Sequence, residues 1–251
     1  MEVIKNKRIG KVLLIVEGGK HEFNLIKKIF VDIFGFTQIE KRRDHARYYV
    51  REKDPHSVIA VINTRTSNIA SIHEREYLEK IYGELIEQHD FDIDNAAIYY
   101  LFDRDPESNT DAKLIVELMR TLKNSRENDD YIQGGMLILS YPSIEAYEIS
   151  SFIDHSYEME ARLGSEIKEY INNHSKLIAM NKMDENSILH AASELLLSFG
   201  QLGAELDLDD FGRTNLQIFK QEESMLRESG TYRLLSLLSC VLMDLGMIAD
   251  Y

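Results

Sequence analysis

Three carboxylates stand at the ends of two strongly apolar segments of the sequence. Glu17 follows VLLIV (residues 12–16), and Asp103 and Asp105 follow AAIYYLF (residues 96–102). Two acids placed two residues apart on an extended chain point to the same side, so both can face one metal ion. Oxygen ligands of this kind suit Mg²⁺, or Mn²⁺ in its place, better than zinc. The pattern therefore predicts that these carboxylates can hold a divalent metal ion.

The two apolar segments also indicate the fold that would position the acids. Strands this apolar are buried on both faces, which is typical of parallel sheets covered by helices. Four strands (residues 12–16, 57–63, 96–102 and 136–140) alternate with helical patterns at residues 21–34, 72–88 and 110–122, the last capped by Thr110 or Asp111. We therefore expect an α/β fold with a parallel sheet of about four strands flanked by helices. Binding groups in such folds gather beyond the carboxyl ends of the strands, where the acids stand.

The C-terminal part of the chain has a different pattern. Long helical patterns replace the strands at residues 165–178, 187–199, 215–228 and 232–248. We expect a metal-binding α/β domain over residues 1–155 and an all-helical subdomain over residues 156–251. Cys240, in the last apolar run, is expected to be a small buried hydrophobe. The same apolar helices could supply the surface of a homodimer.

Composition limits the kinds of partner. The 251 residues carry a formal net charge of −14, which argues against indiscriminate binding to nucleic acid. Contacts with nucleic acid should therefore be local, metal-assisted or shared with a partner. No apolar stretch approaches the roughly 20 residues that cross a bilayer, and no secretory signal is present, so a cytoplasmic location without membrane contact is expected.

One basic segment stands out in this acidic chain. KRRDHARYYVREK (residues 41–53) interleaves basic side chains with Tyr48 and Tyr49, which could stack on bases. The candidate contacts to a nucleic-acid backbone are Lys41, Arg42, Arg43, Arg47 and Arg51, together with Lys20. A solvated basic edge and a protein-docking surface remain alternatives for the segment.

Taken together, IVEGGKHE and a later strand ending in FDRD resemble the Toprim domain, a metal-binding module of topoisomerases and primases. The resemblance covers about the first 150 residues. Within that superfamily, EGGKHE (residues 17–22) and SYPSIEAYEISSF (residues 140–152) are most similar to the RloB-like and OLD-like branch of anti-phage proteins. His21 stands where that branch has threonine.

The resemblance implies a Mg²⁺-dependent nuclease that acts beside a separate ABC-type ATPase, as a toxic effector in antiviral defence or abortive infection. Glu17, Asp103 and Asp105 would be the metal ligands, with Glu17 also serving as general acid or base. Glu145 would be a further acid near the site, or else a capping carboxylate of the helix that begins near Ser143. Lys20 and Lys113 could steady the scissile phosphate, although solvated lysines would look the same in the sequence.

Several other functions are excluded or remain open. GGK (residues 18–20) lacks the remaining positions of a P-loop, and no HExxH or GxSxG motif occurs. PESNTDAK follows the DxD in place of the glycine common in topoisomerases and primases, so strand passage and primer synthesis are not expected. The substrate is DNA or RNA, with tRNA among the candidates. The competing hypothesis is a non-catalytic Toprim-fold module that docks on the ATPase.

Overall fold

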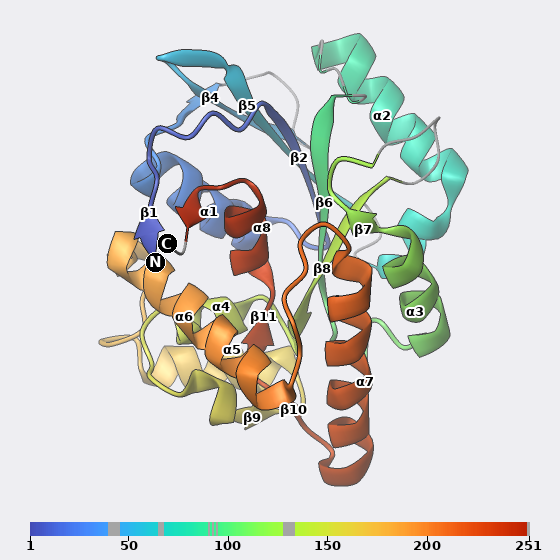
Figure 1. The fold of residues 1–251 in the computed structure, drawn as a ribbon, viewed down its shortest axis with the longest axis vertical. Helices are drawn as coiled ribbons and strands as arrows, with labels where there is room; N and C mark the ends of the chain where they lie inside the picture. Colours follow the sequence, from blue (N-terminus) through green and yellow to red (C-terminus); the bar gives the residue numbers. More distant parts are fainter. Residues whose placement is uncertain are drawn as a thin grey trace. The chain divides into compact units, whose positions relative to one another are not determined.

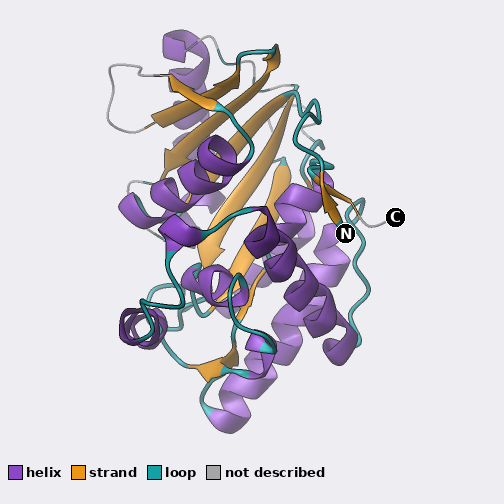
Figure 2. Cartoon of the chain, turned by 90° about the vertical axis from the view of Figure 1, so that its left-hand side faces the viewer, coloured by secondary structure: helices purple, strands orange, loops and turns teal. Residues whose placement is uncertain are grey.

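The chain folds as an α/β protein with a mixed central sheet flanked by helices (Figures 1 and 2). This computed structural model describes residues 1–39, 46–64, 68–89, 91, 93, 95–127 and 134–249. The strand order is β11-β8-β6-β2-β5-β4-β3, and β7 pairs with β8. The bounds are β2 Lys11–Val16, β3 Thr37–Ile39, β4 Ala46–Arg51, β5 Asp54–Asn63, β6 Ala96–Asp103, β7 Lys123–Asn124, β8 Gly135–Tyr141 and β11 Leu235–Ser236.

All four strands expected from the sequence are present, as β2, β5, β6 and β8. The expectation of a purely parallel sheet of about four strands is wrong, because β4 pairs antiparallel with β5 and β3 antiparallel with β4. Only Glu52 and Lys53 separate β4 from β5. A connection this short can only make a hairpin, since a parallel neighbour needs a crossover of a dozen or more residues.

The described chain divides into two compact units. The strand-rich unit comprises Arg8–Leu101 and Asp111–Leu137, and the helix-rich unit comprises Met1–Lys7, Phe102–Thr110 and Ile138–Tyr251. These units are defined by the contacts within each of them. The expected domain boundary between residues 155 and 156 therefore stays a prediction.

In the strand-rich unit, β2 is the central strand. It pairs in parallel with β5 on one side and β6 on the other, and Val12 to Val16 are fully buried. The helical segments are α1 Lys20–Lys27 with a π-helical continuation over Lys28–Ile33, a 3₁₀ turn over Ile69–His73, α2 Arg75–His89 and α3 Ala112–Thr121. Of the two caps expected for α3, Thr110 and Asp111, the structure uses Asp111. Its side chain accepts hydrogen bonds from the amides of Lys113 and Leu114. The apolar runs thus form the interior of this unit and bring their polar ends to the strand termini.

In the helix-rich unit, three of the four expected C-terminal helices are confirmed. They are α5 Gly164–Asn173, α6 Glu185–Leu202 and α7 Phe211–Ser229, accompanied by the short α4 Glu145–Ser150 and 3₁₀ turns over Ser156–Glu158 and Met180–Lys182. Cys240 is buried, as expected.

The expected all-helical subdomain is not confirmed. Residues 232–248 were expected to form one helix and instead form β10 Tyr232–Arg233, β11, α8 Leu238–Asp244 and the start of β12 Ile248–Ala249. β10 pairs with β9 Glu160–Ala161, and β12 pairs with β1 Glu2–Val3. β11 pairs antiparallel with β8, where the hydroxyls of Ser140 and Ser236 lie 2.8 Å apart. Pairing with an existing strand satisfies the backbone of this apolar run and overrides its helical pattern.

Among the residues that the structure describes, no helix combines the length and the apolar character that crossing a membrane requires.

Candidate functional site

Glu17 lies directly beyond the carboxyl end of β2, and its backbone is fixed on both sides within the strand-rich unit. Its amide donates to the carbonyl oxygen of Leu101 in β6 (3.0 Å), and the Thr64 hydroxyl donates to its own carbonyl oxygen (3.1 Å). Glu17 is only 8% exposed. These backbone contacts fix the point at the strand end from which the Glu17 side chain extends.

The glycine after Glu17 makes room for a second acid. A Cβ atom at Gly18 would clash with Oε1 of Glu22, so the Glu22 carboxylate folds back against the turn. Glycine therefore permits the close approach of this side chain to the backbone. Two carboxylates, Glu17 and Glu22, thus flank the turn between β2 and α1.

Asp103 and Asp105 belong to the helix-rich unit, and backbone amides hold both of them. Asp103 Oδ1 accepts from the amide of Ile144 (2.8 Å), and Asp105 Oδ2 accepts from the amide of Gly164 (3.2 Å). Asp105 Oδ1 also accepts from the amide of Glu107 (2.8 Å). Both aspartates are half-buried. Each carboxylate oxygen has two lone pairs, so these amides orient the groups without using up their capacity to bind a cation.

Arg104, between the two aspartates, is buried and has its own partners. It is 3% exposed, its guanidinium pairs with Glu223 on α7 (2.8 Å), and it donates to the carbonyl oxygen of Asn109 (2.7 Å). The aspartates, in contrast, contact Ile144 and Gly164. The alternation that the sequence predicts for the DxD, with both acids on one side, agrees with these separate sets of partners.

Glu145 begins α4, next to the amide that binds Asp103. Its side chain is 3% exposed and lies 3.3 Å from Nζ of Lys168, so it is neither a solvated acid nor part of a side-chain cap. A Cβ atom at Gly164 would lie 2.9 Å from Cβ of Ser143 and 3.6 Å from Oδ2 of Asp105. The structure thus brings the DxD, the Ser143–Glu145 segment and the start of α5 together in one unit.

The two lysines assigned to phosphate binding lie in the strand-rich unit. Lys20 is the first residue of α1 and Lys113 is the second residue of α3, and both side chains are exposed. Either lysine can reach a ligand from solvent.

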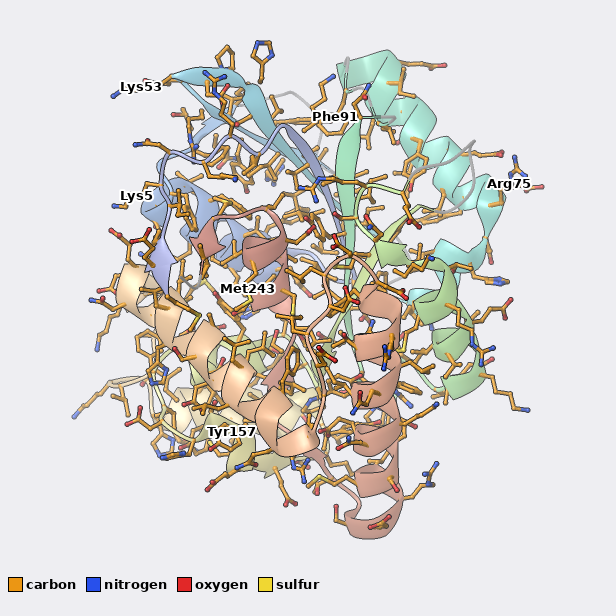
Figure 3. All side chains as sticks on the ribbon, viewed as in Figure 1. Lys5, Lys53, Arg75, Phe91, Tyr157 and Met243 are labelled. Carbon is orange, nitrogen blue, oxygen red and sulfur yellow. The ribbon has the colours of Figure 1, made fainter. Side chains whose placement is uncertain are left out.

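The basic segment is only partly described. Lys41, Arg42 and Arg43 lie outside the described residues. Arg47, on β4, is half-buried, and Lys53, at the turn between β4 and β5, points away from the hairpin into solvent (Figure 3).

Arg51 and the two tyrosines differ from the expectation of a solvent-facing nucleic-acid surface. Arg51 is 7% exposed and stacks over the ring of Phe36 at 4.5 Å, and burial lowers the pKa of its guanidinium. Tyr48 and Tyr49 are buried because β4 lies in the sheet and not in a surface loop. Their rings pack in the core, so the expectation that both are free to stack on bases is wrong.

A group that the sequence analysis missed lies in the helix-rich unit. Ligand atoms of Asp154, His190 and Glu194 all lie within 4.8 Å of one another, so these residues could hold a metal ion. His190 and Glu194 stand four residues apart on α6 and share one helix face. That HxxxE spacing was readable in the sequence.

The contacts of His190 fix its tautomer. Its Nδ1 donates to the carbonyl oxygen of Ser150 (2.6 Å), because a carbonyl can only accept, and its Nε2 faces Oδ1 of Asp154 (2.8 Å). Burial alone would lower the pKa of His190, but the hydrogen bonds with Asp154 and Ser150 and the charge of Glu194 outweigh it and raise the pKa. A second proton therefore occupies Nε2 readily, and a metal ion could take its place.

Glu194 is anchored by the turn that follows Asp154. Its two oxygens accept from the amides of His155 (3.1 Å) and Ser156 (2.8 Å), and the Ser156 hydroxyl donates to it as well (3.1 Å). These contacts close the loop after α4 onto α6. The group thus has a structural role with or without a metal ion.

No protein-family model matches the chain, and no curated protein or solved structure matches it either. Assignment of a function accordingly rests on the residues and their geometry.

Proposed function

We propose that the protein is a Mg²⁺-dependent nuclease of the Toprim type, with Asp103, Asp105 and Glu17 as the metal ligands. The observation that carries this proposal is the arrangement at the end of β6. Asp103 and Asp105 are half-buried and are oriented by the amides of Ile144 and Gly164. Two carboxylates fixed by backbone groups form a preorganised pair of oxygen ligands, as Mg²⁺ requires.

The pairing of β2 with β6 supports including Glu17. Val16 lies opposite Leu101, and the amide of Glu17 bonds to the Leu101 carbonyl. Asp103 follows Leu101 by two residues along the same strand. Parallel strands end at the same edge of a sheet, so this register favours assigning all three acids to one metal ion.

The chemistry divides between the ion and the side chains. When bound, Mg²⁺ would offset the charge of a phosphodiester and lower the pKa of a water molecule near it. Glu17 would accept the proton of the attacking water. Glu145, held against Lys168, would brace the segment whose Ile144 amide orients Asp103. Lys20 and Lys113 would bind phosphate oxygens, as exposed ammonium groups do.

The biological setting is part of the same proposal. We place the nuclease in the cytoplasm, as an effector of anti-phage defence that an ABC-type ATPase holds inactive. The formal charge of −14 favours a basic partner surface. The nuclease could also form a homodimer while it is bound to the ATPase. Whether the cleaved strand is DNA or RNA is decided by the assay below.

The Asp154–His190–Glu194 group supports a second, non-catalytic function. One imidazole and two carboxylates suit Zn²⁺ or Mn²⁺, and the group closes the loop after α4 onto α6. If this group is the metal site of the protein, the chain is a metal-stabilised module that docks on its partner. Metal-binding measurements on variants of each group separate the two functions.

The deciding experiment measures cleavage of labelled DNA and total RNA with Mg²⁺, Mn²⁺ or EDTA. The variants are Asp103→Asn, Asp105→Asn and Glu17→Gln, because an amide keeps the shape and the acceptor oxygen but loses the charge. Glu87→Gln, at an exposed position of α2, removes the same charge elsewhere and is the matched control. We expect cleavage by the wild type and by the control, and a loss of about 10²-fold or more in each ligand variant.

Circular dichroism confirms that each variant is folded, and calorimetry measures Mg²⁺ binding. Undiminished cleavage by the Asp103→Asn/Asp105→Asn double variant would refute the proposal. No cleavage by the wild type, together with metal binding that persists in the Asp103→Asn/Asp105→Asn variant and is lost in His190→Ala, would favour the docking module.

A further inference from the structure

A cavity of about 500 Å³ opens in the strand-rich unit, next to the turn that carries Glu17. It is lined by Gly19, Lys20, Phe23, Asn24 and Lys27 from the start and body of α1, Gln38 from β3, Arg47 and Tyr49 from β4, and Asn63 from β5. Its volume is in the usual range for small-molecule sites. All of its walls belong to one compact unit.

The cavity is lined by positive charge, whereas the chain as a whole is negatively charged. Three of its lining residues, Lys20, Lys27 and Arg47, are cationic, and none is acidic, in a protein with a formal net charge of −14. In the part of the chain that the structure describes, none of these three side chains forms an ion pair with a carboxylate. Three like charges around one concavity repel one another, and an anion placed between them relieves that repulsion.

The remaining lining residues suit a base and a sugar. The guanidinium of Arg47 lies over the ring of Phe23 at 5.5 Å, which forms a flat surface of the kind that nucleobases stack on. Asn24, Gln38 and Asn63 supply amide groups, which both donate and accept hydrogen bonds at base edges. Tyr49 adds an aromatic ring to the wall even though it is buried.

We propose that this cavity binds one phosphate-bearing nucleotide of a single-stranded nucleic acid, with Lys20, Lys27 and Arg47 around the phosphate. The identity of that strand as the substrate rests on the proposed nuclease function. Gly19 lines the cavity and stands two residues after Glu17, so a strand seated here leads to the acidic turn. The cavity would thereby supply the grip on a polyanion that carboxylates and a metal ion alone do not provide.

The test measures binding without cleavage. Fluorescence anisotropy follows a labelled single-stranded oligonucleotide of about 12 nucleotides, as DNA and as RNA, in EDTA, so that no metal-dependent cleavage occurs. The pocket variant is Lys27→Gln/Arg47→Gln. The matched control is Lys80→Gln/Arg120→Gln, which removes the same two charges from exposed positions of the same unit.

We expect the pocket variant to weaken binding about tenfold or more relative to the control. Its plot of log affinity against log salt concentration should also become shallower by up to about 0.7, since one phosphate contact to a single strand contributes about 0.7. Equal affinity and equal salt dependence of pocket variant and control would overturn the inference, as would the absence of binding by the wild type.

Competition identifies the source of the phosphate. Displacement of the oligonucleotide only by unlabelled oligonucleotide supports a strand-binding site, whereas displacement by millimolar AMP or inorganic phosphate to the same extent shows a free-ligand site and overturns the assignment to a strand. The experiments distinguish failure of the pocket proposal from failure of the nuclease proposal. Loss of binding in the pocket variant without any cleavage by the wild type removes only the nuclease, and cleavage that needs Asp103 with unchanged pocket-variant binding removes only the pocket.

Discussion

Glu222, on α7, gives the protein a pH-dependent stability that can be calculated in advance. The residue is 0% exposed, and burial raises the pKa of its carboxyl from its usual 4.5 to about 7. The amide of Arg233 donates to its Oε2 (3.0 Å) and, with the Arg233 charge, partly opposes this rise, while Glu160 and Glu223 add to it. The folded protein therefore keeps a proton on Glu222 that the unfolded chain has already released.

The sign of the effect follows from proton binding. Between pH 4.5 and about 7 the folded state binds more protons than the unfolded state, so stability falls as the pH rises. The contribution is fully present below pH 4.5 and is lost as the pH rises through about 7. At about 1.4 kcal/mol per pH unit, the full loss is about 3 kcal/mol. Glu222→Gln, which carries no titrating proton, should escape this loss.

Chemical denaturation of the wild type and Glu222→Gln at pH 5, 6, 7 and 8 measures the effect. The difference in unfolding free energy between the two proteins cancels other titrating groups, such as His190. We expect it to grow in favour of the glutamine variant from near its starting value at pH 5 by about 2–3 kcal/mol at pH 8. A difference that stays constant within about 0.5 kcal/mol across this range would refute a buried, protonated Glu222.

Three further predictions concern other contacts of the fold. Arg104→Met should destabilise the protein by about 3–5 kcal/mol in denaturant, because it leaves Glu223 without its buried partner; Arg104→Met/Glu223→Leu should recover most of that loss. Asp111→Ala should cost about 1 kcal/mol through loss of the cap of α3, whereas Asp111→Asn should cost little. If the group around His190 binds Zn²⁺, a concentration of about 100 times Kd should stabilise the wild type by about 2.7 kcal/mol, and His190→Ala should remove this gain; equal stabilisation of both proteins would place the metal elsewhere.

The sequence predicted the central strands well because their side chains are apolar on both faces. Residues 12–16 and 96–102 differ from β2 and β6 by only one residue at one end. β4 was missed because Arg47 and Arg51 made it look like a polar segment. One of these arginines lines a cavity and the other covers a phenylalanine ring, so neither marks a solvated loop.

Some residues of the candidate site could likewise be predicted from local sequence, and others could not. Local spacing was enough to identify Asp103 and Asp105, since side chains two residues apart on an extended chain point to the same side. The burial of Glu145 depends on Lys168 and the packing of α4, which no local pattern encodes. Asp154 precedes His190 by 36 residues, and only the return of α6 to the loop after α4 brings the two together.

The buried pair of Arg104 and Glu223 bears on the chemistry as well as on stability. A buried ion pair often contributes little net free energy, because desolvation of both charges offsets their attraction. Its effect on register is different. A shift of one residue at the end of β6 would place the Arg104 side chain where Asp103 and Asp105 now accept amide hydrogen bonds, and would place a carboxylate opposite Glu223. Both changes are unfavourable, so Glu223 on α7 favours the register in which the two aspartates face the amides of Ile144 and Gly164. The ligand pair of the proposed metal site is thus specified by a charge that points away from it.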